Sequence, residues 1–294
     1  MTLEQLRIFV AVAEREHVTR AAEALHLTQS AVSGAVQALE ARHGVALFHR
    51  VGRRIELTQA GRVFLGEARA VLARAAAAEL ALAEFAGLRR GTLRLHASQT
   101  IASYWLPAHL VRFRRSYPQI ELRLAVGNTA GVARAVLDGA AELGFVEGEV
   151  DEPALLGRRV GEDALVLVVG ADHPWACGAP VTAAMLLETD WVLREPGSGT
   201  RSVFEAALRT AGVEAGRLNV VLELPSNEAV RAAVEAGAGA TVISEAVAEA
   251  RLRAGRLRQV PFSLPLRPFT ALRHRERYRS RATEALLAII DGTP

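Results

Sequence analysis

Four short polar clusters could bind a small ligand, because each follows an apolar, strand-like run and opens a helical pattern. The clusters are Ser98-Gln99-Thr100, Asn128-Thr129, Arg194 with Ser198 and Thr200, and Ser226-Asn227. Ligands of open α/β sheets bind at the carboxyl ends of strands, and free backbone N–H groups at helix starts favour anions. The clusters therefore predict an oxyanion pocket. The competing interpretation, that each is an ordinary helix N-cap, fits one cluster better than it fits four.

The histidines and serines of the chain form no catalytic or metal-binding motif. His96, His109, His173 and His274 are scattered, without the spacing of metal ligands. Gly197-Ser198-Gly199 matches neither the G-x-S-x-G nucleophile elbow nor a phosphate-binding loop, which carries a lysine. We therefore expect no enzyme, no metal and no cofactor. Catalysis is the main rival class, and turnover of a bound ligand would support it.

The elements that must hold these clusters alternate between strand and helix from Thr92 onward, which predicts an α/β fold. Strands are expected at Thr92–Ala97, Glu121–Val126, Glu142–Val146, Ala164–Val169, Trp191–Leu193, Asn219–Leu224, Thr241–Ile243 and Phe269–Arg273. Helices are expected at Ser103–Tyr117, Val132–Leu137, Arg201–Thr210, Glu228–Glu235 and Arg281–Asp291.

Length and charge place a second module before this one. The chain has 294 residues, enough for about two domains. Residues 1–90 hold 12 Arg and 9 Glu and so carry the whole net charge of +3, which fits a DNA-facing module attached to a neutral one. No apolar run is long enough for a transmembrane helix, and no signal peptide is expected. Cys177 is the only cysteine, which excludes an internal disulfide. We expect a cytoplasmic protein without a membrane partner.

The N-terminal module is predicted to be a helix–turn–helix followed by a wing. Thr2 and Gln5 form a capping box, Thr19 is expected to cap the second helix, and Thr28 the third, which runs from Gln29 to His43 before Gly44. In the third helix, Ala31, Val32, Ala35, Val36 and Leu39 are expected to face the core. Short polar groups on the outer face suit base edges and phosphates, and arginines on a wing suit phosphates or a narrow minor groove.

The expected DNA contacts are Arg20, Thr28, Gln29, Ser30, Ser33, Gln37, Arg50, Arg53 and Arg54. Two competing interpretations remain open: helix–turn–helix shapes also occur in proteins that never touch DNA, and an arginine cluster can be a solvated surface.

A long helix from Thr58 to about Phe85 is predicted to connect the modules. Its apolar seam is Phe64, Ala68, Val71, Ala75, Ala78, Leu82 and Phe85, with alternating steps of four and three. This heptad pattern predicts dimerisation, and a two-fold dimer predicts palindromic half-sites in the DNA. The alternative is that the helix packs on its own chain.

Several segments together resemble the LysR-type transcriptional regulators along essentially the whole chain. They are LEQLRIFVAVAE, TRAAEALHLTQSAVSGAVQALE, ALFHRVGRRIELTQAG, LPAHLVRFRRSYPQIELRL and DGAAELGFVEG. The resemblance implies a winged helix–turn–helix over 1–58, a linker helix and hinge over 59–90, and an effector-binding module of the periplasmic-binding-protein type over 91–294. It also implies a homotetramer that bends promoter DNA with dyad symmetry, and RNA polymerase as a further partner.

The family's chain path divides the effector module into two subdomains, about 91–161 with 267–294 and about 162–266. The crossings are expected near Val160-Gly161 and Leu264–Arg267. The effector would lie between the subdomains. The residues implied are Ser98, Gln99, Thr100, Asn128, Thr129, Glu147, Arg194, Ser198, Thr200 and Asn227.

The segments REPGSGTR and GFVEG resemble a subgroup with regulators of sulfur assimilation and carbon dioxide fixation, which sense small anions or phosphorylated metabolites. Glu147 opposes an anion unless it pairs with Arg194 or marks the cleft rim. Many members carry Arg where this chain has Gly34, which removes an expected DNA contact. Besides a ligand-responsive regulator, the sequence leaves open a constitutive DNA-bending protein and, with less support, a solute-binding protein.

Overall fold

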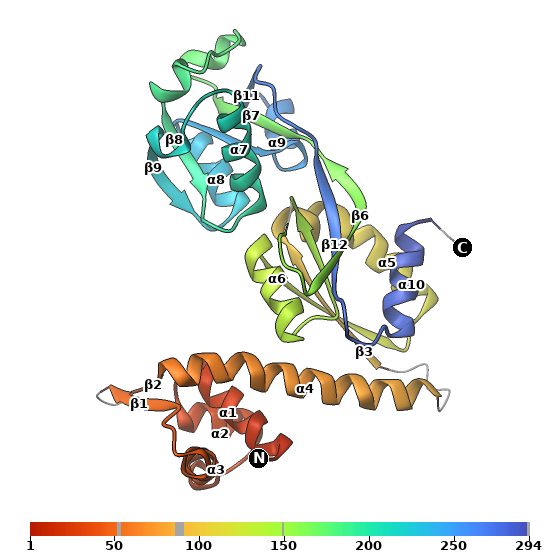
Figure 1. The fold of residues 1–294 in the computed structure, drawn as a ribbon. Helices are drawn as coiled ribbons and strands as arrows, with labels where there is room; N and C mark the ends of the chain where they lie inside the picture. The colour runs from red at the N-terminus through yellow and green to blue at the C-terminus, as the bar shows by residue number, and fades with distance from the viewer. Residues whose placement is uncertain (52–53, 86–90, 149, 293–294) are drawn as a thin grey trace. The chain divides into compact units, whose positions relative to one another are not determined.

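The chain folds as two units, whose elements are labelled in Figure 1. A computed structural model describes residues 1–51, 54–85, 91–148 and 150–292. The first unit contains the N-terminal helices, a β-hairpin and the long helix. The second contains two five-stranded sheets with their helices. The expected combination of a helix–turn–helix with an α/β module is confirmed.

The N-terminal unit has the caps that its sequence predicts, with one exception. It comprises α1 (Leu3–Arg15), α2 (Val18–Leu25), α3 (Gln29–His43) and the antiparallel pair β1 (Phe48–Val51) and β2 (Arg54–Leu57). The Thr2–Gln5 capping box is present, and Thr28 caps α3, which ends at left-handed Gly44. The cap predicted at Thr19 is wrong: His17 Nδ1 accepts from Arg20 N at 3.4 Å, so α2 begins earlier.

The core of this unit lies between α1, α3 and the start of the long helix. Phe9 and Leu39 are buried within it. Val32 and Leu39 are the buried residues of α3, whereas Ala31, which we expected to face the core, is exposed. Ala31 lies in the first turn of α3, one position before the buried row, and therefore faces outward.

The long helix α4 runs over Gln59–Phe85, and its first turns belong to the core of the N-terminal unit. Thr58 Oγ1 accepts from Gly61 N at 2.9 Å and caps the helix start. The Phe64 ring lies 4.9 Å from that of Phe9, and Ala68 is buried in the same cluster. The beginning of the expected dimer seam therefore packs on its own chain, as the alternative interpretation held.

The second unit carries two mixed five-stranded sheets. The first has the order β4-β3-β5-β12-β6 and the second β11-β7-β10-β8-β9. The strands of the first sheet are β3 (Gly91–Ser98), β4 (Ile120–Gly127), β5 (Leu143–Glu147), β6 (Leu155–Asp163) and β12 (Arg267–His274). Those of the second are β7 (Leu165–Gly170), β8 (Asp190–Arg194), β9 (Asn219–Leu224), β10 (Ala240–Ser244) and β11 (Leu257–Val260).

Helices cover both sheets. They are α5 (Leu106–Ser116), preceded by a π-turn at Ile101–Trp105, then α6 (Thr129–Asp138), α7 (Gly199–Thr210), α8 (Asn227–Glu235), α9 (Glu245–Arg253) and α10 (Arg281–Ile290). Short 3-10 turns occur at Pro174–Cys177, Met185–Leu187 and Ala215–Arg217. Each sheet has its own apolar core, one around Phe113 and Phe145, the other around Trp191 and Phe204.

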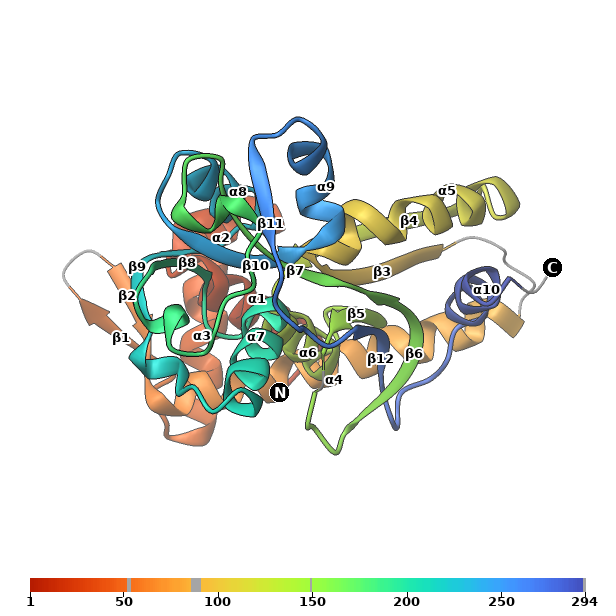
Figure 2. The same ribbon diagram turned by 90° about the horizontal axis from the view of Figure 1, so that it is seen from above.

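The chain crosses between the sheets twice, along strands that lie side by side. β6 and β12 pair antiparallel from Leu155 with His274 to Asp163 with Arg267, as Figures 1 and 2 show. The first crossing follows Asp163, slightly later than expected near Val160-Gly161, because β6 continues to that residue. The second crossing precedes Arg267, as expected. One acidic and one basic residue therefore meet at the crossings.

No described helix is both long enough and apolar enough to cross a membrane.

Candidate ligand-binding site and nucleic-acid interface

The residues expected around a ligand come together at the carboxyl ends of strands from both sheets. Ser98 ends β3, Glu147 ends β5 and Arg194 ends β8, while α6, α7 and α8 begin at Thr129, Gly199 and Asn227. Eight of the ten expected residues are buried: Ser98, Thr100, Thr129, Glu147, Arg194, Ser198, Thr200 and Asn227. Gln99 and Asn128 are half-buried.

The N-cap interpretation holds for two of the four clusters. Asn128 Oδ1 accepts from Gly131 N at 2.9 Å, and Ser226 Oγ accepts from Ala229 N at 3.3 Å. Ser198 makes no side-chain cap hydrogen bond with α7, and Thr100 none with the turn that follows it. The hydroxyl groups of Thr100 and Thr200 contact Arg267 instead.

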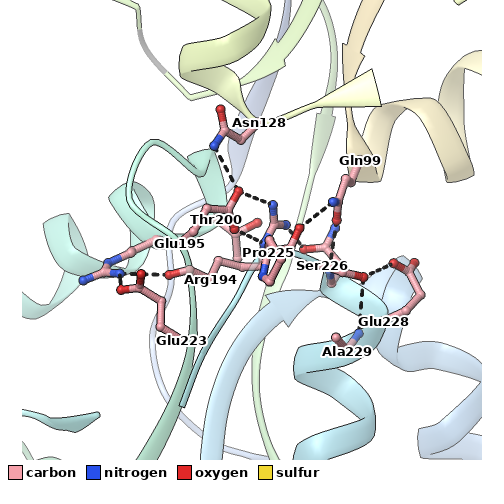
Figure 3. A network of polar contacts seen from close by, with 12 residues as sticks. Gln99, Asn128, Arg194, Glu195, Thr200, Glu223, Pro225, Ser226, Glu228 and Ala229 are labelled. Atoms are coloured by element: carbon pink, nitrogen blue, oxygen red, sulfur yellow. Dashed lines mark hydrogen bonds and ion pairs between the residues drawn. The ribbon is translucent and has the colours of Figure 1, made fainter. Parts of the chain in front are cut away.

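Gln99 and Asn227 connect the loop after β3 to the start of α8, and Figure 3 shows Gln99 beside Pro225. Gln99 Nε2 donates to Pro225 O at 2.7 Å, and Gln99 Oε1 accepts from Asn227 N at 2.9 Å. Asn227 Nδ2 also donates to Thr100 Oγ1 at 3.1 Å. The loop after β3 is thereby fastened to the start of α8.

Arg194 lies in a complete set of acceptors. Its Nε and Nη2 donate to the two carboxylate oxygens of Glu195 at 2.7 and 2.9 Å, and its Nη1 donates to Asn227 Oδ1. Glu195 also accepts from Asn128 Nδ2 at 3.0 Å, and Figure 3 shows these contacts. Burial alone would raise the pKa of the Glu195 carboxyl, but the hydrogen bonds from Arg194 and Asn128 outweigh it and lower that pKa.

Arg267, which our site prediction missed, lies at the centre of the network. It is 1 % exposed. Its Nε and Nη2 donate to Asp163 Oδ2 at 2.9 and 2.5 Å. Its Nη1 donates to Thr200 Oγ1 at 3.0 Å and its Nη2 to Thr100 Oγ1 at 3.3 Å, so one guanidinium connects a hydroxyl from each sheet.

Glu147 faces Arg267 rather than Arg194. Its Oε1 lies 4.0 Å from Arg267 Nη2, and the residue is 3 % exposed, so it neither pairs with Arg194 nor marks the rim. The buried network thus holds two arginines against three carboxylates, those of Glu147, Asp163 and Glu195. The network therefore contains hydroxyl and guanidinium donors, but it also has one more carboxylate than it has arginines.

A close backbone approach holds the α7 start against this network. A Cβ on Gly199 would stand 2.4 Å from Glu147 O and 2.7 Å from Thr129 Oγ1, distances at which something must shift. Thr129 Oγ1 itself donates to Glu147 O at 3.1 Å. Only glycine at 199 lets the β8–α7 turn pack against the end of β5.

The N-terminal unit presents polar side chains along α3. Gln29, Ser30 and Gln37 are exposed and Ser33 is half-buried, while Arg20 is exposed on α2. Thr28 has a structural role as well, since its hydroxyl caps α3 and lies 3.1 Å from Ser30 Oγ. Arg50 and Arg54 lie on β1 and β2 without described side chains, and Arg53 lies outside the described residues.

Gly34 lies on the exposed side of α3 with space around it. A Cβ at this position would meet nothing within 4 Å. The departure from arginine at 34 is therefore not forced by packing within the unit.

Both units match known family descriptions. Residues 3–62 match "Bacterial regulatory helix-turn-helix protein, lysR family", and residues 86–293 match "LysR substrate binding domain". The Escherichia coli K12 protein described as "Uncharacterized HTH-type transcriptional regulator YeiE" is 37% identical over 293 residues, which cover 99% of this chain and 97% of YeiE.

Two further similarities are to a regulator described by its link to RuBisCO and to a regulatory domain solved with a ligand. A "Probable RuBisCO transcriptional regulator" of Trichormus variabilis is 32% identical over 97% of this chain and 86% of its own length. The regulatory domain of CcmR from Synechocystis PCC6803, solved in complex with 2-PG, superposes with a TM-score of 0.63 at 26% identity and covers 69% of this chain and 98% of that domain.

Proposed function

Because the chain belongs to the LysR family of DNA-binding transcriptional regulators, we propose that a small anion binding beside Arg267 changes how it binds promoter DNA. The family is one of regulators with an effector-binding domain and not of enzymes. The observation that carries the proposal is the Arg267 guanidinium, which joins Thr100 and Thr200 from opposite sheets. A ligand that takes over these hydrogen bonds changes how the two sheets are held together.

The proposed ligand carries both anionic oxygens and a hydrogen-bond donor. Anionic oxygens suit the hydroxyl groups of Thr100 and Thr200 and the guanidinium of Arg267. The carboxylate of Glu147 repels a ligand made of anionic oxygens alone, and a hydroxyl or protonated acid group on the ligand would turn this contact into a hydrogen bond. Phosphorylated or hydroxylated small carboxylic acids fit these needs. The 2-PG complex of the CcmR domain supports this class.

The proposed DNA surface is the exposed face of α3 with the β1–β2 wing. The exposed side chains of Gln29, Ser30 and Gln37 would contact base edges. The phosphate contacts would come from four arginines: Arg20, Arg50, Arg53 and Arg54. Because Gly34 supplies no side chain, base and phosphate contacts depend more on these neighbours.

The assembly that we propose is a homodimer through the later part of α4, and a homotetramer by analogy with the family. Val71 and Leu82 of the seam are 42 and 73% exposed, which leaves them for a partner helix. Ala75 and Ala78 between them would allow close approach, and Phe85 completes the pattern. A cytoplasmic location beside the DNA and contact with RNA polymerase would follow from this function.

A thermal-shift screen tests the ligand proposal. Sulfate, sulfite, thiosulfate, nitrate, phosphoglycerates, ribulose bisphosphate and NADPH would be added to the full-length protein. A ligand at about 100 times its Kd stabilises the folded state by about 2.7 kcal/mol. We expect a phosphorylated acid to raise the Tm, and T200V to abolish that rise. T210V, an exposed threonine on the same helix, is the matched control.

DNA binding of the same proteins decides whether the hit is an effector. Duplex DNA selected by the protein from a random pool would show dyad symmetry if the dimer binds as proposed. The ligand should change the affinity for this DNA at least several-fold. An unchanged affinity, with ligand bound, would instead favour a constitutive DNA-bending regulator.

A further inference from the structure

A cavity lies on the first sheet, between its β5–β12–β6 edge and α10. It has a volume of about 320 Å³, at the lower end of ligand pockets. Its apolar wall includes Leu143 of β5, Leu156 of β6 and Leu287 of α10. Arg273 of β12 also lines it, six residues from Arg267 on the same strand. At about 3.3 Å per residue, the two arginines are roughly 20 Å apart along the strand.

Three arginines line this cavity, and one of them has no hydrogen-bond acceptor among the described residues. Arg158 pairs with Asp291 at 3.0 Å, and Arg279 faces Glu284 at 3.7 Å. For Arg273, the described residues offer no hydrogen bond and no ion pair within 4.0 Å, although its side chain is half-buried. Burial lowers the pKa of the Arg273 guanidinium and the nearby positive charge of Arg279 lowers it further, while the carboxylate of Glu284 raises it by less.

An unpaired, half-buried guanidinium is costly, because it loses water without gaining an acceptor. The register of the sheet fixes the face on which Arg273 lies. Arg273 pairs with Leu156, and Ala271 pairs with Arg158. These side chains therefore share the face that α10 covers. Asp291 pairs with Arg158, whereas Glu284 lies near Arg279 and also attracts Arg273, without an ion pair to Arg273 within 4.0 Å. The three arginines carry three positive charges, and Glu284 and Asp291 carry two negative ones. The net charge around the cavity is therefore +1.

We propose that this cavity is a second ligand site, separate from the one at Arg267, that binds a small monocarboxylic acid with an apolar body. The carboxylate would pair with Arg273, where a planar guanidinium offers two parallel N–H donors. The apolar body would lie against Leu143, Leu156 and Leu287. The site differs from the first in chemistry, because its lining combines leucine side chains with charged ones and includes no threonine hydroxyl.

Calorimetric titration of the full-length protein tests the proposal, with hexanoate as the probe. Hexanol keeps the apolar body without the charge, and acetate and sulfate keep the charge without the body. We expect saturable binding of hexanoate, and binding at least about tenfold weaker for each of the three controls. Hexanol or sulfate that binds as tightly as hexanoate would overturn the proposal, as would the absence of saturable hexanoate binding at millimolar concentrations.

Two substitutions locate the site. R273Q removes the unpaired cation and should weaken hexanoate binding about tenfold or more, whereas R275Q, which removes an exposed arginine two residues away, should leave it unchanged. Equal weakening by both variants would mean non-specific attraction to positive charge and would overturn the proposal. T100V, in the Arg267 site, should leave hexanoate binding intact. Loss of binding in T100V would place hexanoate in the first site and also overturn it.

Discussion

Arg267 and Asp163 lie at the two points where the chain crosses between its sheets, and their side chains form a buried ion pair, with Nε–Oδ2 2.9 Å. Asp163 also accepts from Ser244 Oγ at 3.0 Å, so the pair is tied to β10 of the second sheet. The same pair therefore fixes both crossings and positions the guanidinium that reaches Thr100 and Thr200.

Replacing Arg267 by Met should lower the free energy of unfolding by about 3–5 kcal/mol, because Asp163 and Glu147 would stay buried without their cation. Urea denaturation measures this change. R159Q, which removes an exposed arginine of β6, should alter it by less than about 0.5 kcal/mol. The double variant R267M/D163N should recover part of the loss, and no recovery would show that the two residues do not act as a pair.

Thr100→Val should abolish the ligand-induced rise in Tm, since its hydroxyl accepts from both Asn227 and Arg267 at the centre of the first site. DNA affinity without ligand should stay within about twofold, because the DNA surface is on the other unit. T100S keeps the hydroxyl and should restore the response. A normal response in T100V would move the effector away from this network.

Replacing Gly34 by Arg should strengthen DNA binding and steepen its salt dependence by about 0.9 in the log–log slope, the value for one added phosphate contact. The open space around Gly34 means that the side chain meets no obstacle. G34A is the control, because it removes the helix penalty of about 1 kcal/mol without adding charge. Fluorescence anisotropy at several salt concentrations separates the two effects. Equal slopes in both variants would place position 34 away from phosphate.

Arg53 and Arg54 replaced together by Ala should lower the same salt slope by up to about 2, as expected if both wing arginines contact phosphate. The measurement is again anisotropy against salt concentration. A slope equal to that of the unaltered protein would remove the wing from the DNA interface.

Leu82→Glu should weaken dimerisation, because it places a charge in the exposed part of the α4 seam. Sedimentation equilibrium over a range of protein concentrations measures the change. V63E is the matched control, since Val63 is 68% exposed on the same helix but outside the seam. Equal dimer constants for the two variants would contradict the role of the seam.

Stability should fall as the pH drops from about 7 to about 5. Burial lowers the pKa of His96, His109 and His173 in the folded protein, so the unfolded chain binds more protons just below the ordinary value of about 6.5. The stabilising effect of keeping these rings neutral is thus complete above that value and is lost below it. The Tm measured against pH should flatten when all three are replaced by Gln, and an unchanged profile would assign the loss to other groups.

Local sequence signals located most elements of the fold. The caps at Thr2, Thr28 and Gly44 rest on side chains or conformations within a few residues, and the structure has all three. β6 was missed because Gly157, Arg158 and Arg159 interrupt its apolar pattern, and its stability comes from pairing with β12 instead. The Thr19 cap failed because His17, a less common capping residue, competes two positions earlier.

The residues that come together at the strand ends could be predicted from the sequence, but the hydrogen bonds that they form could not. The residues that come together follow the carboxyl ends of strands, and the order of strands and helices is enough to predict this. Arg267 was not predicted because its partners are far away in the sequence. Asp163 is 104 positions away and Thr100 is 167 positions away, and a local sequence pattern does not predict contacts over such separations. One signal could have indicated this pairing, because an acidic residue, Asp163, and a basic residue, Arg267, lie at the two crossings of the chain. The pairing of Arg194 with adjacent Glu195, rather than Glu147, also depended on side-chain geometry.

Arg267 already donates hydrogen bonds to Thr100 and Thr200. The proposed ligand must therefore compete with these internal hydrogen bonds. The oxygens of the proposed ligand can form hydrogen bonds with these groups only if the internal hydrogen bonds break. The affinity of the proposed ligand then reflects the difference between the contacts that it gains and the internal contacts that are lost. Variants that weaken the resting set, without removing the shared donors, should therefore be more sensitive receptors than the natural protein.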